Sequence, residues 1–165
     1  MIRLLAALPL LAVALASPPL AADDKKKDEP PFELTADEKQ ILEMTNAERA
    51  KEKLPPLKPN PVLTKIARAH SANMAKKGEM KHVLDGKNPA QRTADGGYDY
   101  ARVAENIAVG ENAELKDIME GWMNSKVHRE NILRTGLEEI GLGIARNDKG
   151  EVYYTQLFGT QRKKR

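Results

Sequence analysis

The sequence predicts an α/β protein, an α/β/α three-layer sandwich in which helices flank a small, mainly antiparallel, three-stranded sheet. Two observations carry this prediction. Apolar residues recur at helical spacing in several segments before residue 134, whereas "EIGLGIARNDKGEVYYTQLFG" at residues 139–159 alternates with the period of strands. Both faces of these strands carry apolar residues, so each face needs a covering layer of helices.

A first helix is predicted over residues 36–52. Thr35 and Glu38 form a capping-box pattern ahead of apolar residues at helical spacing. The helix is expected to end at "KLPPLKPNP", residues 53–61, because the prolines in this segment disfavour helix and strand alike.

A second helix is predicted to begin with Asn60 as its cap and Pro61 as its first residue, and to end at Gly78. His70 lies on its apolar stripe. Residues 79–102 are then predicted to form one irregular loop, punctuated by glycine and proline. A loop of this length in a small domain is usually functional or mobile.

A third helix is predicted over residues 113–125, and residues 127–133 add one or two helical turns. The single tryptophan, Trp122, lies on the apolar face of this helix and is predicted to be buried against the sheet. Residues 103–109 alternate and predict one strand of the sheet, and the other two strands form a hairpin around residues 147–150.

One face of the first hairpin strand is predicted to be nearly flat, because Gly141 and Gly143 alternate with bulky aliphatic residues. A helix can approach such a face closely. The opposite face carries the bulky side chains, and both faces need helical cover.

The chain is divided into four segments by composition. Residues 1–22 have the layout of a secretory signal peptide, with an apolar run too short to span a bilayer and a cleavage position expected between Ala16 and Ala22. The alternatives are an N-terminal membrane anchor and an apolar helix of no targeting role. The expected remainder is a charged, proline-containing linker at 23–34, a domain at 35–161 and a basic tail at 162–165. We expect a secreted or periplasmic protein with no transmembrane segment in its mature chain.

Composition excludes several classes of function. The chain has no cysteine, which rules out cysteine nucleophiles, thiolate metal sites and disulfides. Its 27 basic residues nearly balance its 24 acidic ones without a concentrated basic stripe, so we expect no nucleic-acid partner. We expect a monomer that packs without cross-links.

Glu105 is the most informative polar residue, because it alternates with apolar residues on what reads as a buried face. A buried carboxylate is costly unless it is paired, hydrogen-bonded or bound to a cation. The alternatives are a glutamate at a strand end that reaches solvent, and a helical turn in place of the strand.

The chain contains only three histidines. Taken singly, His82 reads as a loop residue and His70 as a hydrogen-bonded core histidine, whereas His128 is either packing material or part of a site. Asn106 and Gln156 are polar strand residues that could orient such a site. Sequence spacing alone cannot bring these residues together.

Five segments together resemble the CAP superfamily, the SCP domain shared by cysteine-rich secretory proteins, antigen 5 and plant pathogenesis-related proteins. They are "TNAERAKEKLPPLKPNPVLTKIARAHSANMAKKGEMKH", "AENIAVG", "WMNSKVHRENIL", "EIGLGIA" and "YYTQLFG". The resemblance covers roughly residues 40–160 and is closest to the compact, cysteine-free bacterial branch. It implies the same α/β/α sandwich.

The resemblance also implies a site. The family's cavity carries two histidines and two glutamates, which match His82, His128 and Glu105, while the second glutamate falls on Ser125. Ala104 stands where the family motif has glycine. We expect His82 and His128 to be direct ligands of zinc or another divalent cation, with Glu105 either a third ligand or a base acting on bound water. Asn106, Ser125, His70 and Gln156 are expected to support the cleft. The alternative is a polar network that only stabilises the floor of a cleft.

The function expected from these features is that of an exported binding module, with a small molecule, a lipid or an envelope component as its ligand. One alternative is a metal-assisted hydrolase acting on extracellular or envelope polymers, and another is a lipid- or sterol-binding protein. The missing second carboxylate and the lack of a supported nucleophile count against an enzyme. No catalytic residue is assigned.

Overall fold

The computed structural model describes residues 32–163. The predicted signal peptide and the predicted linker as far as residue 31 lie outside the described residues, as do the last two residues of the predicted basic tail. The elements are α1 (Ala36–Lys51), β1 (Lys58–Pro59), α2 (Pro61–Lys77), α3 (Pro89–Asp95), β2 (Tyr100–Glu111), α4 (Leu115–Asn124), α5 (Lys126–Ile132), β3 (Glu139–Arg146) and β4 (Glu151–Gln161).

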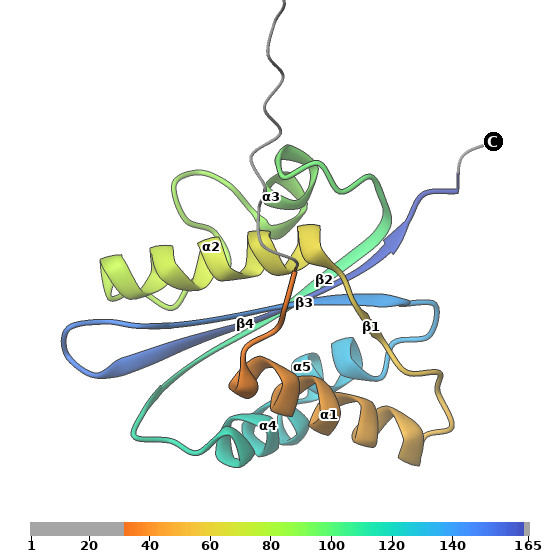
Figure 1. The fold of residues 1–165 in the computed structure, drawn as a ribbon, viewed down its shortest axis with the longest axis horizontal. Coiled ribbons are helices and arrows are strands. Elements are labelled where there is room, and N and C mark those ends of the chain that lie inside the picture. Colours follow the sequence, from red (N-terminus) through yellow and green to blue (C-terminus); the bar gives the residue numbers. More distant parts are fainter. Residues whose placement is uncertain (1–31, 164–165) are drawn as a thin grey trace, which may run out of the picture. The chain divides into compact units, whose positions relative to one another are not determined.

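Three layers make up this part of the chain. The sheet has the order β1-β3-β4-β2 and is antiparallel except for the pairing of β1 with β3. Figure 1 shows α2 and α3 on one face of the sheet and α1, α4 and α5 on the other. The predicted α/β/α sandwich is confirmed, although the sheet has four strands rather than three. No helix among the described residues is both long enough and apolar enough to span a membrane.

The additional strand, β1, lies in the proline-rich segment for which the sequence predicted no strand. The backbone N–H of Lys58 donates to Glu138 O at 3.0 Å, and that of Asn60 donates to Ile140 O at 2.9 Å. Pro59 lies between these two donors, so the N–H that it lacks is not needed for the pairing. A proline is tolerated here because β1 is a short strand at the edge of the sheet.

The predicted loop over residues 79–102 is also wrong in part, because it contains α3 and the beginning of β2. Asn88 caps α3 in a capping box with Gln91, and Pro89 is its first residue. This is the same Asn-Pro signal that correctly predicted the start of α2 at Asn60. The helix was missed because it has only two turns and no apolar stripe to mark it.

Helix α2 lies directly on the flat face of β3, as predicted. A β-carbon built on Gly141 would lie 2.1 Å from the backbone carbonyl carbon of Leu63, and one built on Gly143 would lie 2.3 Å from that of Ala67. Because these neighbours are backbone atoms of the helix, neither glycine can carry a side chain without moving α2 away from the sheet.

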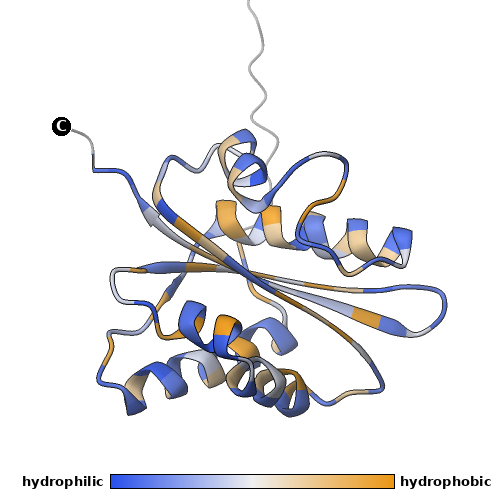
Figure 2. Cartoon of the chain, turned by 180° about the vertical axis from the view of Figure 1, so that it is seen from behind, coloured by the Kyte–Doolittle hydropathy of each residue, from blue (hydrophilic) through white to orange (hydrophobic). Residues whose placement is uncertain are grey.

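The opposite face carries the largest apolar cluster of the described residues, which joins α1, α4 and α5 to the bulky face of the sheet. Trp122 is 2% exposed within it, and its indole Nε1–H donates to Ile107 O at 3.1 Å. The prediction that this residue is buried against the sheet is confirmed. Figure 2 shows apolar residues on the strands and hydrophilic ones over much of the helical surface.

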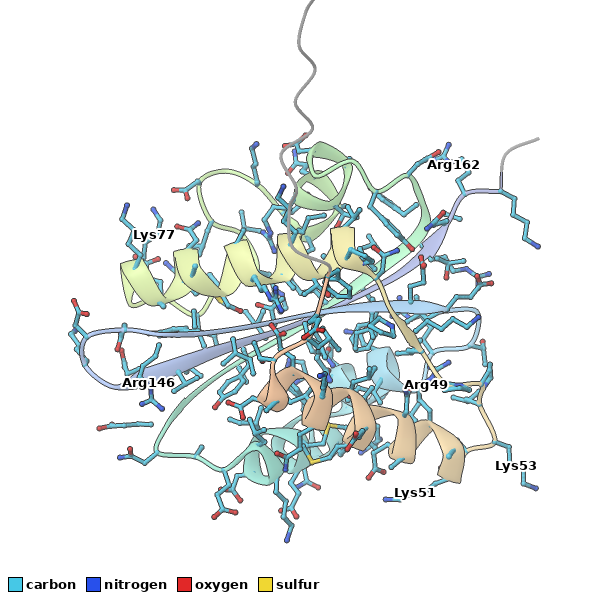
Figure 3. All side chains as sticks on the ribbon, in the orientation of Figure 1. Arg49, Lys51, Lys53, Lys77, Arg146 and Arg162 are labelled. Carbon is cyan, nitrogen blue, oxygen red and sulfur yellow. The ribbon has the colours of Figure 1, made fainter. Side chains whose placement is uncertain are left out.

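Arg49, labelled in Figure 3, fixes the end of α1 to the segment that follows α5. Its side chain is fully buried, and burial lowers its pKa. The guanidinium donates to four backbone carbonyls rather than to a carboxylate, those of Pro55, Ile132, Arg134 and Leu137. This contact holds α5, the helix that carries His128, against the core.

Candidate functional site

Glu105 is the centre of a buried polar cluster on the α2 side of the sheet. Its side chain is 2% exposed, so the prediction of a buried carboxylate is confirmed and the solvent-reaching alternative is wrong. Its Oε1 lies 2.9 Å from His82 Nδ1 and 3.8 Å from His70 Nε2. Its Oε2 accepts a hydrogen bond of 2.6 Å from Arg92 Nη2. Hydrogen bonds from Arg92 and His82 therefore compensate its burial.

His82 follows α2 and presents its ring at the surface, with 46% of the side chain exposed. The carboxylate of Glu105 accepts the hydrogen bond from Nδ1, so the neutral ring carries its proton there. Nε2 is then left with a free lone pair. Histidine ligands in metal and catalytic sites are commonly oriented by a carboxylate in this way.

His70 lies behind this pair and is 2% exposed. Its predicted burial is confirmed, but neither ring nitrogen makes a hydrogen bond of good geometry, contrary to expectation. Burial lowers the pKa of His70, and the negative charge of Glu105 opposes that effect. His70 is therefore a neutral buried neighbour of the site.

Arg92, on α3, is a member of the cluster that the sequence did not predict. Its Nη1 donates to the backbone carbonyls of His82 at 2.7 Å and Lys87 at 2.9 Å, in addition to the Nη2 contact with Glu105. The sequence contained one indication of such a partner, since a buried Glu105 needs an ion pair, hydrogen bonds or a bound cation. It pointed to no particular residue because α3 itself was not predicted.

His128 lies on α5 and is half-buried. Burial lowers its pKa, and the charge of His82 lowers it further, which places the two imidazoles within electrostatic reach of one another. Its backbone carbonyl accepts a hydrogen bond from Asn106 Nδ2 at 3.1 Å. No direct contact joins the side chain of His128 to Glu105 within residues 32–163.

An amide network on the opposite face of the sheet supports the strand that carries Glu105. Asn106 donates to Gln156 Oε1 at 3.0 Å, and Gln156 donates to the Thr45 hydroxyl at 2.8 Å. Asn131, on α5, donates to Asn106 Oδ1 at 2.9 Å and was not predicted. Ser125 joins α4 to α5 and is half-buried, but its side chain makes no capping bond.

The cluster has the donor types of a metal centre without its full geometry. In the part of the chain that the structure describes, no three histidine or acidic side chains converge so that they could hold a metal ion. Both oxygens of Glu105 are engaged by His82 and Arg92. A groove of about 610 Å³ between α2 and α3 reaches the same cluster, with His70 and Arg92 among the residues that line it.

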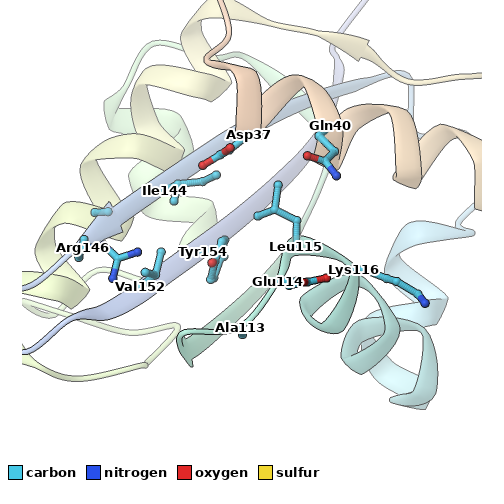
Figure 4. Close-up of a pocket in the computed structure, with 11 residues that line it drawn as sticks. Asp37, Gln40, Ala113, Glu114, Leu115, Lys116, Ile144, Arg146, Val152 and Tyr154 are labelled. Carbon is cyan, nitrogen blue, oxygen red and sulfur yellow. The ribbon is translucent and has the colours of Figure 1, made fainter.

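A second hollow, of about 600 Å³, lies away from this cluster and contains none of the predicted site residues. Figure 4 shows its lining, which comes from the first turns of α1 and α4 and from the β3–β4 hairpin. Charged residues such as Asp37 and Arg146 accompany aliphatic ones such as Ile144 and Val152. The pKa of Tyr154 in its wall is raised by burial and by the charge of Asp37.

Comparisons with known proteins agree with this architecture. The CAP family model, described as the cysteine-rich secretory protein family, matches residues 42–158. The Bacillus subtilis protein YkwD is 35% identical over 130 residues, which are 78% of this chain and 49% of YkwD. The membrane protein YlbC of the same organism is 33% identical over 125 residues, 75% of this chain and 34% of YlbC. The chain thus spans half or less of these relatives.

Two solved structures have a similar fold. An extracellular protein with an SCP domain from Bacillus anthracis is 26% identical, with a TM-score of 0.68, over 79% of this chain and 45% of that one. An outer surface protein from Borrelia burgdorferi is 24% identical, with a TM-score of 0.73, over 79% of this chain and 97% of that one, and it supports the fold alone. The motifs, the three-layer architecture and the family match agree, and the chain belongs to the CAP family, in its cysteine-free form.

Proposed function

We propose that this protein is an exported CAP-domain binding module whose ligand contacts the exposed edge of His82. The observation that carries the proposal is the 2.9 Å contact between His82 Nδ1 and the buried carboxylate of Glu105, which leaves Nε2 free at the surface. A secreted or surface location is supported by the relatives described as extracellular and as an outer surface protein.

The arrangement favours binding over catalysis. A general base must reach the proton that it removes, and the carboxylate of Glu105 is buried between His82 and Arg92. The position that matches the family's second glutamate is Ser125. A hydrolase acting on envelope polymers stays the alternative, and it would have to use His82 as its base.

Exposed apolar side chains next to both histidines support a ligand with an apolar part. Met80 is 46% exposed, Val83 is 54% exposed and Val127 is 66% exposed. Each lies within two positions of His82 or His128 in the sequence. Large apolar side chains held in water next to polar groups are typical of binding surfaces.

The ligands that we propose for a divalent cation such as zinc are two imidazoles, those of His82 and His128, and the electrostatic influence of His82 on His128 supports the pairing. A bound cation would act as a Lewis acid that polarises a ligand oxygen. Glu105 would orient the His82 ring from the outer shell rather than coordinate directly, because its oxygens are engaged. A site with two protein ligands binds zinc weakly, so we expect an affinity well below that of a closed structural site.

Zinc titration calorimetry tests the metal part of the proposal, on the intact protein and on the His82→Ala and His128→Ala variants. Glu79→Gln, which changes an exposed carboxylate close to His82 in sequence, is the matched control. We expect each histidine variant to lose at least tenfold in affinity and the control to bind like the intact protein. Affinity should also fall below about pH 6.5, where imidazole protonates. Absent binding, or unchanged affinity in both histidine variants, would exclude the metal.

A lipid or sterol ligand is the second candidate, and the observation that favours it is the aliphatic part of the hollow in Figure 4, which charged side chains such as Asp37 and Arg146 also line. Its aliphatic residues include Leu115, Ile144 and Val152. Extraction of protein purified from its own host, followed by mass spectrometry of the extract, tests this candidate. A stoichiometric lipid would support it, and an extract without lipid would count against it.

A further inference from the structure

We propose that Arg92 is the positioning residue of the His82 site, fixing both the backbone and the ring tautomer of that histidine. This inference rests on the proposed function only in taking His82 as the ligand-facing residue. The guanidinium makes three hydrogen bonds. One is to the backbone of His82 itself, one is to the carboxylate that holds the His82 ring, and one is to Lys87, at the far end of the turn that follows His82.

The Nη1 nitrogen of Arg92 holds the backbone on either side of the turn after His82. Arg92 Nη1 donates to His82 O at 2.7 Å and to Lys87 O at 2.9 Å, so it joins the two ends of the segment that carries His82. Between them the chain makes a tight turn, in which Asp85 has φ +51° and Gly86 has φ +72°. Backbone hydrogen bonds within the turn close it, and the two Nη1 contacts add a side-chain link between its ends.

The Nη2 nitrogen of Arg92 holds the His82 ring through Glu105. Arg92 Nη2 donates to Glu105 Oε2 at 2.6 Å, and the other oxygen of that carboxylate lies 2.9 Å from His82 Nδ1. The positive charge of Arg92 compensates the buried negative charge of Glu105. The carboxylate can then act only as an acceptor, which places the proton of His82 on Nδ1 and leaves Nε2 free for the ligand.

This task requires an arginine rather than a lysine. A planar guanidinium presents several donors in fixed directions, whereas an ammonium is a point charge at the end of a flexible stem. Lysine at this position could neutralise Glu105, but it could not also hold the two carbonyls. The contact further explains why a short helix interrupts the loop, since α3, capped by Asn88, provides a rigid support for Arg92.

The test is nitrogen-15 NMR of the histidine rings in the purified full chain at about pH 8, where an ordinary imidazole with a pKa of about 6.5 is neutral. We expect His82 of the unaltered protein to have its proton on Nδ1, the tautomer that a free histidine ring disfavours. Arg92→Gln should shift His82 toward the Nε2–H tautomer. Arg92→Lys should retain the Nδ1–H tautomer but raise the amide exchange rates of residues 83–87 by at least tenfold.

Arg68→Gln is the matched control, because Arg68 forms a similar pair with the buried Glu38 through contacts of 2.8 and 2.6 Å. Losing that pair should leave the tautomer of His82 and the exchange rates of residues 83–87 unchanged. The inference is overturned if Arg92→Gln and Arg92→Lys both leave these signals unaltered, or if Arg68→Gln changes them equally. Should Arg92→Gln fail to fold, Arg92→Lys decides alone by its exchange rates. No ligand is used, so a failed zinc titration and a failed tautomer test are separate results.

Discussion

The two faces of the sheet achieve burial in different ways. The face toward α1, α4 and α5 carries one large apolar cluster that includes Trp122 and Phe158. The face toward α2 carries two smaller clusters, and this face also holds polar groups such as Ser71, whose hydroxyl lies 2.8 Å from that of Thr155. On this second face the helix meets the sheet through backbone at Gly143.

This difference explains where the site lies. The first face is filled mainly by large apolar side chains. Its amide network is uncharged, and the buried guanidinium of Arg49 donates to backbone carbonyls rather than to a carboxylate. The glycine face brings α2 close to β3, whereas beside β2 the layer between helices and sheet contains His70, Glu105 and Arg92. We infer that the first face supplies most of the apolar contribution to stability and that the second provides the site.

The largest expected effect tests the first face. Trp122→Ala removes the largest side chain of that cluster and its hydrogen bond to Ile107, and it should lower the free energy of unfolding by about 3–5 kcal/mol. Trp122→Phe keeps most of the ring volume and should cost about 1 kcal/mol for the lost hydrogen bond and a smaller cavity. Urea denaturation followed by circular dichroism measures both. A near-native midpoint for Trp122→Ala would contradict the assigned role of this face.

The second prediction tests the close contact on the other face. Gly143→Ala would place a β-carbon 2.3 Å from the backbone of Ala67, so α2 must shift, at a cost of about 3 kcal/mol. Gly121→Ala is the matched control, since a β-carbon there meets nothing within 4 Å on the exposed side of α4. It should stabilise the protein by up to about 1 kcal/mol through helix propensity. Equal midpoints for the two variants would show that α2 is not in backbone contact with the sheet.

The flat face illustrates how much of the fold the sequence could predict. The alternating glycines in β3 predicted that a helix packs closely on that face of the sheet. The Asn-Pro and Thr-x-x-Glu patterns predicted where α2 and α1 begin. These features depend on residues close together in the chain. The two-residue strand β1 could not be predicted in this way, because its pairing depends on where residues 139 and 140 arrive in space.

The same limit applies to the candidate site, where local features were predictable and tertiary partners were not. Burial of Glu105 followed from strand alternation, and its need for a compensating charge followed from electrostatics. The identity of the partner did not follow, because Arg92 reaches Glu105 only through the placement of α3. The joining of Glu105 to His82 came from family resemblance and is found in the structure, whereas a three-ligand metal centre with His128 stays a prediction.

Stability should depend on pH through two histidines, His70 on α2 and His128 on α5. Burial lowers the pKa of His70 and of His128, so below the unfolded value of about 6.5 the unfolded chain binds protons that the native chain does not. The free energy of unfolding should therefore fall as pH drops from about 7.5 to about 5, by at most about 1.4 kcal/mol per pH unit for each histidine. Urea melts at several pH values measure this slope. His70→Gln should flatten it, and an unchanged slope would remove His70 as a cause.

The smallest expected effect compares the caps of the two helices that begin on opposite faces. Thr35→Ala removes the hydroxyl that accepts from Glu38 N at 3.2 Å at the start of α1, and it should cost about 1 kcal/mol. Asn60→Ala removes the acceptor for Val62 N and Leu63 N at the start of α2.

Asn60 also donates to Glu139 Oε1 at 2.9 Å, which joins α2 to the start of β3. Asn60→Ala should therefore lower the free energy of unfolding by more than Thr35→Ala does, by about 2 kcal/mol, which is at the upper end of cap effects. Thermal and urea unfolding of the two variants, measured side by side, give the difference. A larger loss of stability in Thr35→Ala would mean that the cap of α1 contributes more to folding than the junction of α2 with the sheet. The contrast between the faces would then not extend to their helix caps.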